Sequence, residues 1–244
     1  MTKIIILAAG QGKRMASNLP KVLVPLKNKP IIEYLLNSVK KSNVDKEPII
    51  IVSPKNKEII EEKLAKYNFK TAIQKEQLGT GHAVACAKDL IKSNVKKVIV
   101  LYGDHPFIKS TSIEKLAKLE FSALAIMPTI LADFSNWRQN FYHWGRIIRN
   151  KKNEVEKIVE FKDASLEERK VLEVNPGIMA FNTNWLFEHI EKLRNNNKQK
   201  EYYLTDMVKL AFKEGQIIKT INISPEEAIG INSQKELEIA TSLL

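Results

Sequence analysis

The sequence has a single cysteine, Cys86, among its 244 residues. One thiol cannot form a disulfide within the chain. Because Cys86 lies in the apolar stretch 83–87, we expect it to pack as a small hydrophobic side chain rather than to act as a nucleophile. No apolar run approaches the roughly 20 residues of a membrane-spanning helix. An apolar strand begins within a few residues of Met1 and leaves no room for a secretory leader, so we expect a cytoplasmic protein with no membrane partner.

Arginine is also scarce, with six residues against 33 lysines in a chain of net charge +11. The positive charge raises the alternative of a nucleic-acid binder, which predicts a steeply salt-dependent affinity for DNA. However, the lysines are spread along the whole chain, without the arginine clusters or interleaved aromatics of a single-strand binder. We therefore expect a lysine-rich solvated surface that helps to attract a polyanionic substrate, and no nucleic-acid partner.

Internal repeats, low-complexity tracts and Gly/Ser-rich linkers are absent from the sequence, while segments typical of strands and helices alternate along its first half. Strands are expected at 4–7, 48–53, 69–73, 97–102 and 123–128, and helices at 30–42, 57–67, 81–92 and 111–119. This alternation predicts an α/β fold, a mostly parallel twisted sheet with helices on both faces.

After residue 128 the alternation changes. Hairpin strands are expected at 144–149 and 155–161, further strands at 174–181 and 217–221, and helices at 183–193 and 204–215. We expect these segments to form a smaller β lobe over about 129–222, within a main domain of residues 1–232. An amphipathic helix is expected at 233–244.

The first strand opens into a loop that carries glycines and is followed by cations. Gly10 and Gly12 permit backbone conformations closed to other residues and the close approach of a ligand. Loop N–H groups, together with Arg14 and Lys21, would hold a polyphosphate. The glycines alone also fit an ordinary strand-to-helix turn with surface cations. Their spacing fits neither a Rossmann nor a Walker loop.

A carboxylate, Asp104, follows the most apolar strand, and an amide, Asn232, lies near the other end of the chain. Carboxylate and amide oxygens suit Mg²⁺, which binds one or two protein ligands together with substrate phosphates. Segments after residues 7, 73 and 102 all fall at carboxyl ends of strands, where parallel sheets bind their ligands. An aspartate that caps the following turn is the alternative for Asp104.

The string LAAGQGKRM at 7–15, followed by Leu19-Pro20-Lys21, resembles the signature of sugar-nucleotide pyrophosphorylases. Further motifs follow in family order at 74–83, 102–106, 142–147, 159–164, 175–177 and 195–206. Together they resemble the N-terminal uridylyltransferase domain of the bifunctional GlmU family, over nearly the whole chain. That domain makes UDP-N-acetylglucosamine from UTP and N-acetylglucosamine 1-phosphate.

The resemblance implies roles for the motif residues. Nucleotide contacts are expected from Leu7, Ala8, Ala9, Gly10, Gln74, Gly79 and Thr80. Sugar contacts are expected from Tyr102, Gly103, Gly145, Glu160 and Asn175. Arg14 and Lys21 are the expected catalytic cations, and Asp104 and Asn232 the expected Mg²⁺ ligands. A solvated strand end for Gln74, an outward position for Glu160 and a turn for Asn175 are the alternative interpretations.

The resulting hypothesis is an in-line attack of the sugar 1-phosphate on the α-phosphorus of UTP, with Mg²⁺ as cofactor. A phosphate monoester is already a nucleophile, so no catalytic serine or cysteine is needed. Two alternatives stay open: a nucleotidyltransferase for another base or sugar 1-phosphate, and a catalytically silent sugar-nucleotide-binding protein.

Two residues depart from the family pattern. Pro176 stands where the family usually has threonine, which removes an N–H donor, and His105 replaces a small or apolar residue. The hexapeptide repeats of the family's acetyltransferase domain are absent, and 233–244 resembles the start of its linker helix. We therefore expect no acetyl transfer from this polypeptide, and a monomer or weak dimer.

Overall fold

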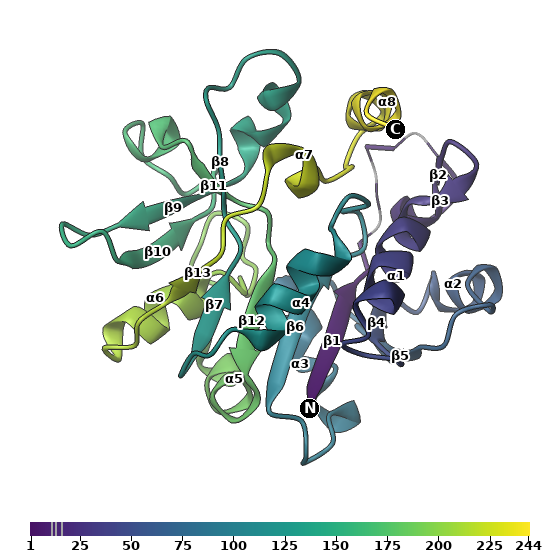
Figure 1. Cartoon of the computed structure of the whole chain (residues 1–244), viewed down its shortest axis with the longest axis horizontal. Coiled ribbons are helices and arrows are strands. Elements are labelled where there is room, and N and C mark those ends of the chain that lie inside the picture. The colour runs from purple at the N-terminus through teal and green to yellow at the C-terminus, as the bar shows by residue number, and fades with distance from the viewer. Residues whose placement is uncertain (11, 13, 16) are drawn as a thin grey trace.

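The computed structural model describes every residue except Gln11, Lys13 and Ala16. Its centre is a seven-stranded sheet in the order β13-β7-β12-β6-β1-β4-β5 (Figure 1). These strands are β1 (Thr2–Leu7), β4 (Ile49–Val52), β5 (Lys70–Ile73), β6 (Lys97–Tyr102), β7 (Leu124–Ile126), β12 (Met179–Asn182) and β13 (Lys219–Thr220). All run in one direction except β12, which pairs antiparallel with both β6 and β7. The expected mostly parallel sheet is confirmed.

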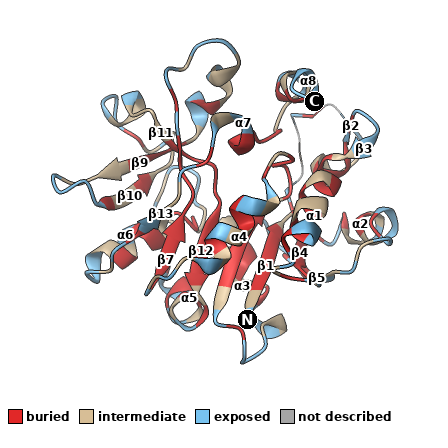
Figure 2. Cartoon of the chain, in the orientation of Figure 1, coloured by how far each residue is buried: buried red, intermediate tan, exposed pale blue. Residues whose placement is uncertain are grey.

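Both faces of this sheet are covered by helices. The helices are α1 (Ile31–Ser42), α2 (Lys57–Lys63), α3 (Thr80–Ala85), α4 (Ser110–Lys118), α5 (Thr183–His189), α6 (Asp206–Lys213), α7 (Pro225–Ala228) and α8 (Gln234–Ser242). Residues of α1 and α4 pack with Ile4 and Ile6 on one face, and residues of α3, α5 and α6 pack with Ile5 on the other. Because successive strand residues face opposite sides of the sheet and both sides are covered, the apolar middles of β1 and β6, residues 4–6 and 98–101, are fully buried (Figure 2).

A second sheet lies to one side of the first, at the upper left of Figure 1. Its strands are β8 (Thr129–Ile130), β9 (Gly145–Arg149), β10 (Val155–Val159) and β11 (Glu173–Asn175), in the antiparallel order β10-β9-β11-β8. The expected hairpin of 144–149 and 155–161 is therefore β9 and β10. A short pair, β2 (Pro25–Leu26) and β3 (Lys29–Pro30), precedes α1.

The single strand expected at 174–181 is wrong. It is two strands, β11 and β12, that belong to different sheets. Pro176 and Gly177 separate them: Gly177 has φ +84°, and its N–H donates to Asn175 Oδ1 at 3.0 Å. This turn carries the chain from the second sheet into the first. The expected lobe, 129–222, consequently contains β12 and β13 of the large sheet, while the second sheet spans 129–175.

Several expected helices are shorter than their apolar patterns. The helix expected at 81–92 ends at Ala85 and is followed by a 3₁₀ turn, Lys88–Leu90, and the one expected at 183–193 ends at His189. An unexpected 3₁₀ helix, Asn136–His143, lies between β8 and β9 in the chain, and it buries only Phe141, so no apolar period predicts it. In the described part of the chain, no helix is long and apolar enough to cross a membrane.

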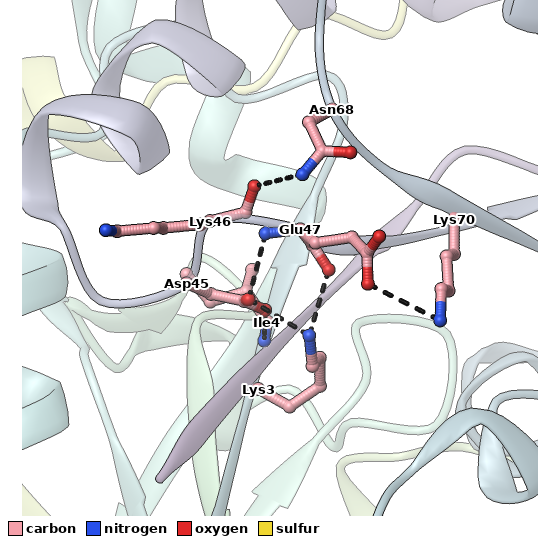
Figure 3. A network of polar contacts seen from close by, with 7 residues as sticks. All are labelled: Lys3, Ile4, Asp45, Lys46, Glu47, Asn68 and Lys70. Atoms are coloured by element: carbon pink, nitrogen blue, oxygen red, sulfur yellow. Dashed lines mark hydrogen bonds and ion pairs between the residues drawn. The ribbon is translucent and has the colours of Figure 1, made fainter.

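A buried polar network joins the amino ends of β1 and β4 (Figure 3). Lys3 Nζ donates to Asp45 Oδ1 at 3.0 Å and to the Glu47 carbonyl at 2.9 Å. The Ile4 N–H donates to Asp45 Oδ2 at 2.8 Å. Both carboxylate oxygens of Asp45 thereby accept a hydrogen bond. Since the amino ends of parallel strands lie opposite their carboxyl ends, this network is on the side of the sheet away from the expected site.

Candidate active site

Two cavities adjoin at the carboxyl ends of the central strands. The smaller has a volume of about 210 Å³ and the larger about 610 Å³. Tyr102 and Asp104, at the end of β6, line both. Residues from distant parts of the sequence meet here because β1, β5 and β6 all end on the same edge of the sheet.

The smaller cavity is built by the residues expected to bind the nucleotide. It is lined by Leu7, Ala8, Ala9, Gly10, Gln74, Gly79 and Thr80, with Lys21 also in its wall. The backbone of Ala8 donates to Ile51 O at 2.9 Å, which continues the pairing of β1 with β4 into the loop. The loop is thus held by the sheet on which it stands.

Gln74 is fixed at the entrance to α3. Its Nε2 donates to Gly79 O at 3.0 Å and lies 3.2 Å from His82 Nδ1. Gly79 itself has φ +115°, and a Cβ there would lie 2.6 Å from Tyr202 O. The segment of Tyr202 therefore packs directly against the start of α3, where the Gly81 N–H donates to Tyr202 O at 2.8 Å. This contact explains how the motif at 195–206 reaches the nucleotide side.

The larger cavity holds the residues expected to bind the sugar. Tyr102, Gly145, Glu160 and Asn175 line it, and Arg14 and Asn232 are in the same wall. Gly103 lines neither cavity among the described residues. Its N–H donates to Leu7 O at 2.9 Å, and a Cβ would lie 3.1 Å from that oxygen. Gly103 thus joins β6 closely to β1 beneath the site.

Lys21, Asp104 and Asn232 form one cluster at the junction of the cavities. Lys21 Nζ donates to Asp104 Oδ2 and, at 2.8 Å, to Asn232 Oδ1. Both oxygens accept from one ammonium, so they are at most roughly 6 Å apart, two hydrogen-bond lengths. The side chain of Asp104 is only 5% exposed. The acid and the amide, 128 positions apart in the sequence, converge as the metal hypothesis requires.

The segment 230–232 is held in place from both sides. The Ile231 N–H donates to Asp104 O at 2.9 Å, and the Asn232 N–H donates to Glu236 Oε2 at 2.7 Å. Glu236 also accepts from Ser233 Oγ, the N-cap of α8. The first turn of the C-terminal helix therefore fixes Asn232 beside Asp104.

This donor set fits Mg²⁺. One carboxylate and one amide oxygen are hard ligands, and here they already converge on a cation, the ammonium of Lys21. Outside positions 11, 13 and 16, the structure has no group of three His, Cys, Asp or Glu side chains that could bind a metal. A divalent ion held by Asp104 and Asn232 would thus complete its shell with substrate phosphates and water.

Electrostatics differ between the carboxyl groups of Asp104, which is buried, and Glu160, which is half-buried. Burial opposes ionisation of Asp104, but the charges of Lys21 and His105 and the Lys21 hydrogen bond outweigh it, so the pKa of Asp104 is lowered. Burial raises the pKa of Glu160, and the charge of Asp206 raises it further, against a hydrogen bond from Thr205. Asp104 therefore stays ionised to lower pH than an ordinary aspartate, whereas the pKa of Glu160 is higher than that of an ordinary glutamate.

His105 is a residue whose role the sequence did not define. It is 5% exposed, and its ring lies between Tyr102 and Trp144, with centroids 5.8 and 5.5 Å away. Its Nδ1 is buried without a hydrogen-bond partner. A Cβ on Gly230 would lie 2.6 Å from His105 Nε2, so the ring packs against the segment that carries Asn232.

Sequence reasoning missed most of the aromatic wall of the larger cavity. Phe134, Asn140, Tyr142, His143 and Trp144 line it, and most of them belong to the 3₁₀ helix. Arg146, which is fully buried, holds this wall by donating to the carbonyls of Tyr142 and Trp144. The only signal was the motif at 142–147, which carries three of these residues.

The fold and the two adjoining cavities are those of an α/β protein with room for two substrates, and the family comparison gives the class. Residues 4–202 match the model of the MobA-like NTP transferase domain. The chain belongs to this family, which confirms the class inferred from the motifs.

The relationship to GlmU is also confirmed. The chain is 39% identical over 240 residues to the bifunctional protein GlmU of Caldicellulosiruptor saccharolyticus, covering 97% of this chain and 50% of that protein. It is 41% identical over 241 residues to GlmU of Clostridium kluyveri, covering 98% and 51%. The chain thus spans about half the length of these relatives.

A likeness among solved structures concerns the fold alone. The inositol-1-phosphate CTP transferase from T. maritima aligns with a TM-score of 0.77 at 18% identity, covering 100% of this chain and 94% of that chain. The agreement supports the α/β architecture and says nothing about the base or the acceptor.

Proposed function

We propose that this protein transfers a uridylyl group from UTP to N-acetylglucosamine 1-phosphate and releases pyrophosphate. The observation that carries the proposal is the cluster of Lys21, Asp104 and Asn232 between a glycine-lined cavity and a larger polar one. This arrangement puts cationic charge where two substrates would meet. The identity of the substrates rests on the GlmU relatives and on the motifs shared with them.

In this reaction a phosphate oxygen of the sugar 1-phosphate attacks the α-phosphorus of UTP. One P–O bond forms as the bond to the leaving pyrophosphate breaks. Asp104 and Asn232 would hold Mg²⁺, which supplies charge neutralisation and alignment of the phosphates when bound. Lys21 and Arg14 carry positive charge in the cavity walls and stabilise the charge that develops on the phosphate oxygens. No group on the protein has to act as a nucleophile or base.

The larger cavity supplies the sugar contacts. Glu160 is positioned by Thr205, whose Oγ1 donates to Glu160 Oε1 at 3.0 Å, so the other carboxylate oxygen can accept from sugar hydroxyls. Gly145 lies beside this carboxylate, and a Cβ there would be 3.4 Å from Glu160 Oε2. The Asn175 side-chain oxygen already accepts from the Gly177 N–H within the turn at 175–177. Pro176 has no backbone N–H that could donate to the sugar. Sugar recognition on this side therefore depends chiefly on Glu160.

A pyrophosphate-release assay tests the proposal. The protein is incubated with Mg²⁺ and each pair from UTP, CTP, dTTP and the 1-phosphates of N-acetylglucosamine and glucose. We expect the highest kcat/KM for UTP with N-acetylglucosamine 1-phosphate. Preference for another pair would assign a different base or sugar. Calorimetric binding of UTP without turnover on any pair would favour the silent binding protein instead.

Three further expectations accompany the proposal. Mg²⁺ is the proposed cofactor, the protein is proposed to be a monomer or weak dimer, and the reaction is proposed to occur in the cytoplasm. Gel filtration and metal replacement test the first two directly.

A further inference from the structure

We propose that Lys21 and the divalent cation compete for the same two oxygens, so that the metal binds tightly only when a triphosphate draws Lys21 away. This inference rests on the proposed function, because it assumes a metal–nucleotide substrate. It adds a role for Lys21: besides stabilising phosphate charge, this residue sets the order in which metal and nucleotide bind.

The positions of three side chains indicate why Lys21 and the metal would compete. Lys21 Nζ donates to Asp104 Oδ2 and to Asn232 Oδ1. A metal bound to these two oxygens would lie about 2.1 Å from each, in the region that the ammonium fills. Two cations cannot share that region, because they repel each other and their radii overlap. Binding of the metal therefore requires Lys21 to leave.

Because the ion pair is buried, the departure of Lys21 and the arrival of the metal depend on each other. The side chains of Lys21 and Asp104 are 17% and 5% exposed. A carboxylate this deeply buried is costly without a cationic partner, so Lys21 leaves Asp104 only as another cation replaces it. The departing ammonium needs an anion in turn. Lys21 also lines the smaller cavity beside Gly10, where phosphates of a bound triphosphate would meet it.

Metal binding and triphosphate binding should therefore strengthen each other. A triphosphate that binds Lys21 frees the oxygens for the metal, and a metal on the oxygens frees Lys21 for the triphosphate. The nucleotide-free protein should accordingly bind Mg²⁺ or Mn²⁺ weakly, although its two ligands are already in place.

The test measures Mn²⁺ binding to the nucleotide-free protein by electron paramagnetic resonance. Lys21→Met removes the competing ammonium and keeps the length of the side chain. Lys235→Met is the matched control, because Lys235 also lines the larger cavity but is exposed on α8. We expect Lys21→Met to tighten Mn²⁺ at least tenfold and Lys235→Met to change it less than threefold. An unchanged or weaker affinity in Lys21→Met, or an equal gain in both variants, would overturn the proposal.

A second measurement tests the coupling from the other side of the ion pair, and its single variant leaves Lys21 in place. In EDTA, Asp104→Asn releases Lys21 from its ion pair, so UTP should bind several-fold more tightly to this variant than to the wild type. The gain should shrink in the Lys21→Met, Asp104→Asn double variant, because the residue that is released is then missing. No gain in the single variant, or the same gain in both backgrounds, contradicts the coupling.

These outcomes are separable from those for the proposed function. Pyrophosphate release by the wild type tests the reaction without reference to Lys21. If the wild type is active and Lys21→Met does not tighten Mn²⁺, the competition is wrong and the reaction stands. If no substrate pair reacts, the reaction is wrong whatever the metal affinity.

Discussion

Gly79 and Gly215 both have positive φ, yet their surroundings differ. A Cβ on Gly79 would lie 2.6 Å from the Tyr202 carbonyl oxygen, whereas a Cβ on Gly215 would meet nothing within 4 Å. We expect Gly79→Ala to cost more than ~2 kcal/mol of unfolding free energy and to weaken UTP binding, since strain and a backbone clash combine. Gly215→Ala should cost about 1 kcal/mol, from backbone strain alone. Urea titration of both variants checks this. Equal losses of unfolding free energy would mean that the Tyr202 carbonyl does not clash with a side chain at position 79.

The charged cluster supports a prediction about turnover. Asp104→Ala and Lys21→Ala should each lower kcat about 10²-fold or more, because each removes a group that aligns or neutralises phosphate charge. The folds should persist in circular dichroism spectra. Lys118→Ala, an exposed change on α4 away from both cavities, is the control and should retain nearly full activity. Pyrophosphate release at wild-type rates in both cluster variants would show that the reaction takes place elsewhere.

The raised pKa of Glu160 predicts how KM for the sugar 1-phosphate changes with pH. Its pKa is raised, chiefly by burial, so on acidification it loses its charge at a higher pH than an ordinary glutamate. The protonated carboxyl accepts hydrogen bonds from sugar hydroxyls less well, so on acidification KM for the sugar 1-phosphate should begin to rise at a higher pH than the usual glutamate pKa of 4.5 would give. Glu160→Gln should raise KM at every pH and flatten this rise. This variant should keep its stability at neutral pH, because the raised pKa of Glu160 means that its ionisation opposes folding there.

At the scale of elements, the N-terminus of α8 positions a metal ligand. Glu236 Oε2 accepts from the Asn232 N–H at 2.7 Å and from Ser233 Oγ at 2.9 Å. Glu236→Ala should cost about 1 kcal/mol of stability and raise several-fold the Mg²⁺ concentration that gives half-maximal rate. Glu238→Ala, an exposed change on the same helix, should do neither. An Mg²⁺ dependence that is the same in both variants would mean that α8 does not position Asn232.

The elements that the sequence predicted best are those buried on both faces. The strand at 97–102 was predicted to the residue, because a continuous apolar run between polar ends has no other stable place in an α/β fold. The segment 174–181 was predicted as one strand because its apolar residues continue across Pro176 and Gly177. An apolar pattern indicates that residues are buried but not in which sheet they lie. The passage of the chain from one sheet to the other therefore could not be predicted from it.

Short elements escaped prediction for a related reason. The 3₁₀ helix Asn136–His143 buries only Phe141, and α7 is four residues long. Their positions depend on contacts made after folding, such as the hydrogen bonds of Arg146 to the carbonyls of Tyr142 and Trp144. Arg146 is only two to four residues from these carbonyls, but one buried arginine adds no apolar period that would predict a helix.

At the scale of the whole molecule, stability and the candidate site can be separated. Lys3 and Asp45, whose side chains are 9% and 3% exposed, form an ion pair at the amino ends of the strands (Figure 3). Asp45→Asn should lower the unfolding free energy by about 3 kcal/mol or more, because it leaves a buried lysine without its partner. Substrate KM values should not change at temperatures where the variant is folded.

Lys70→Ala is the matched control for this prediction. Lys70 pairs with Glu47 in the same network, but the two side chains are 45% and 38% exposed. Its loss should cost less than about 1 kcal/mol. Denaturant titration compares the variants, and equal costs would mean that burial does not decide the strength of the pair.

The candidate site was predictable to the extent that its residues sit in motifs. The residues assigned to the nucleotide, sugar and metal, Gly103 apart, line the two cavities or their junction. The hydrogen bond from Lys21 to Asn232 was not predicted. These residues are 211 positions apart, and no motif in the sequence links them. The position of Lys21 between two expected metal ligands is likewise a property of the folded chain.

The most direct test of the account is a crystal structure with UTP and Mn²⁺, with the metal located by its anomalous scattering. We expect one peak bonded to both Asp104 and Asn232 and to phosphate oxygens, with the Lys21 ammonium moved onto the triphosphate. A peak that contacts neither side chain, or a Lys21 still bonded to Asp104 beside a bound metal–nucleotide, would contradict the account.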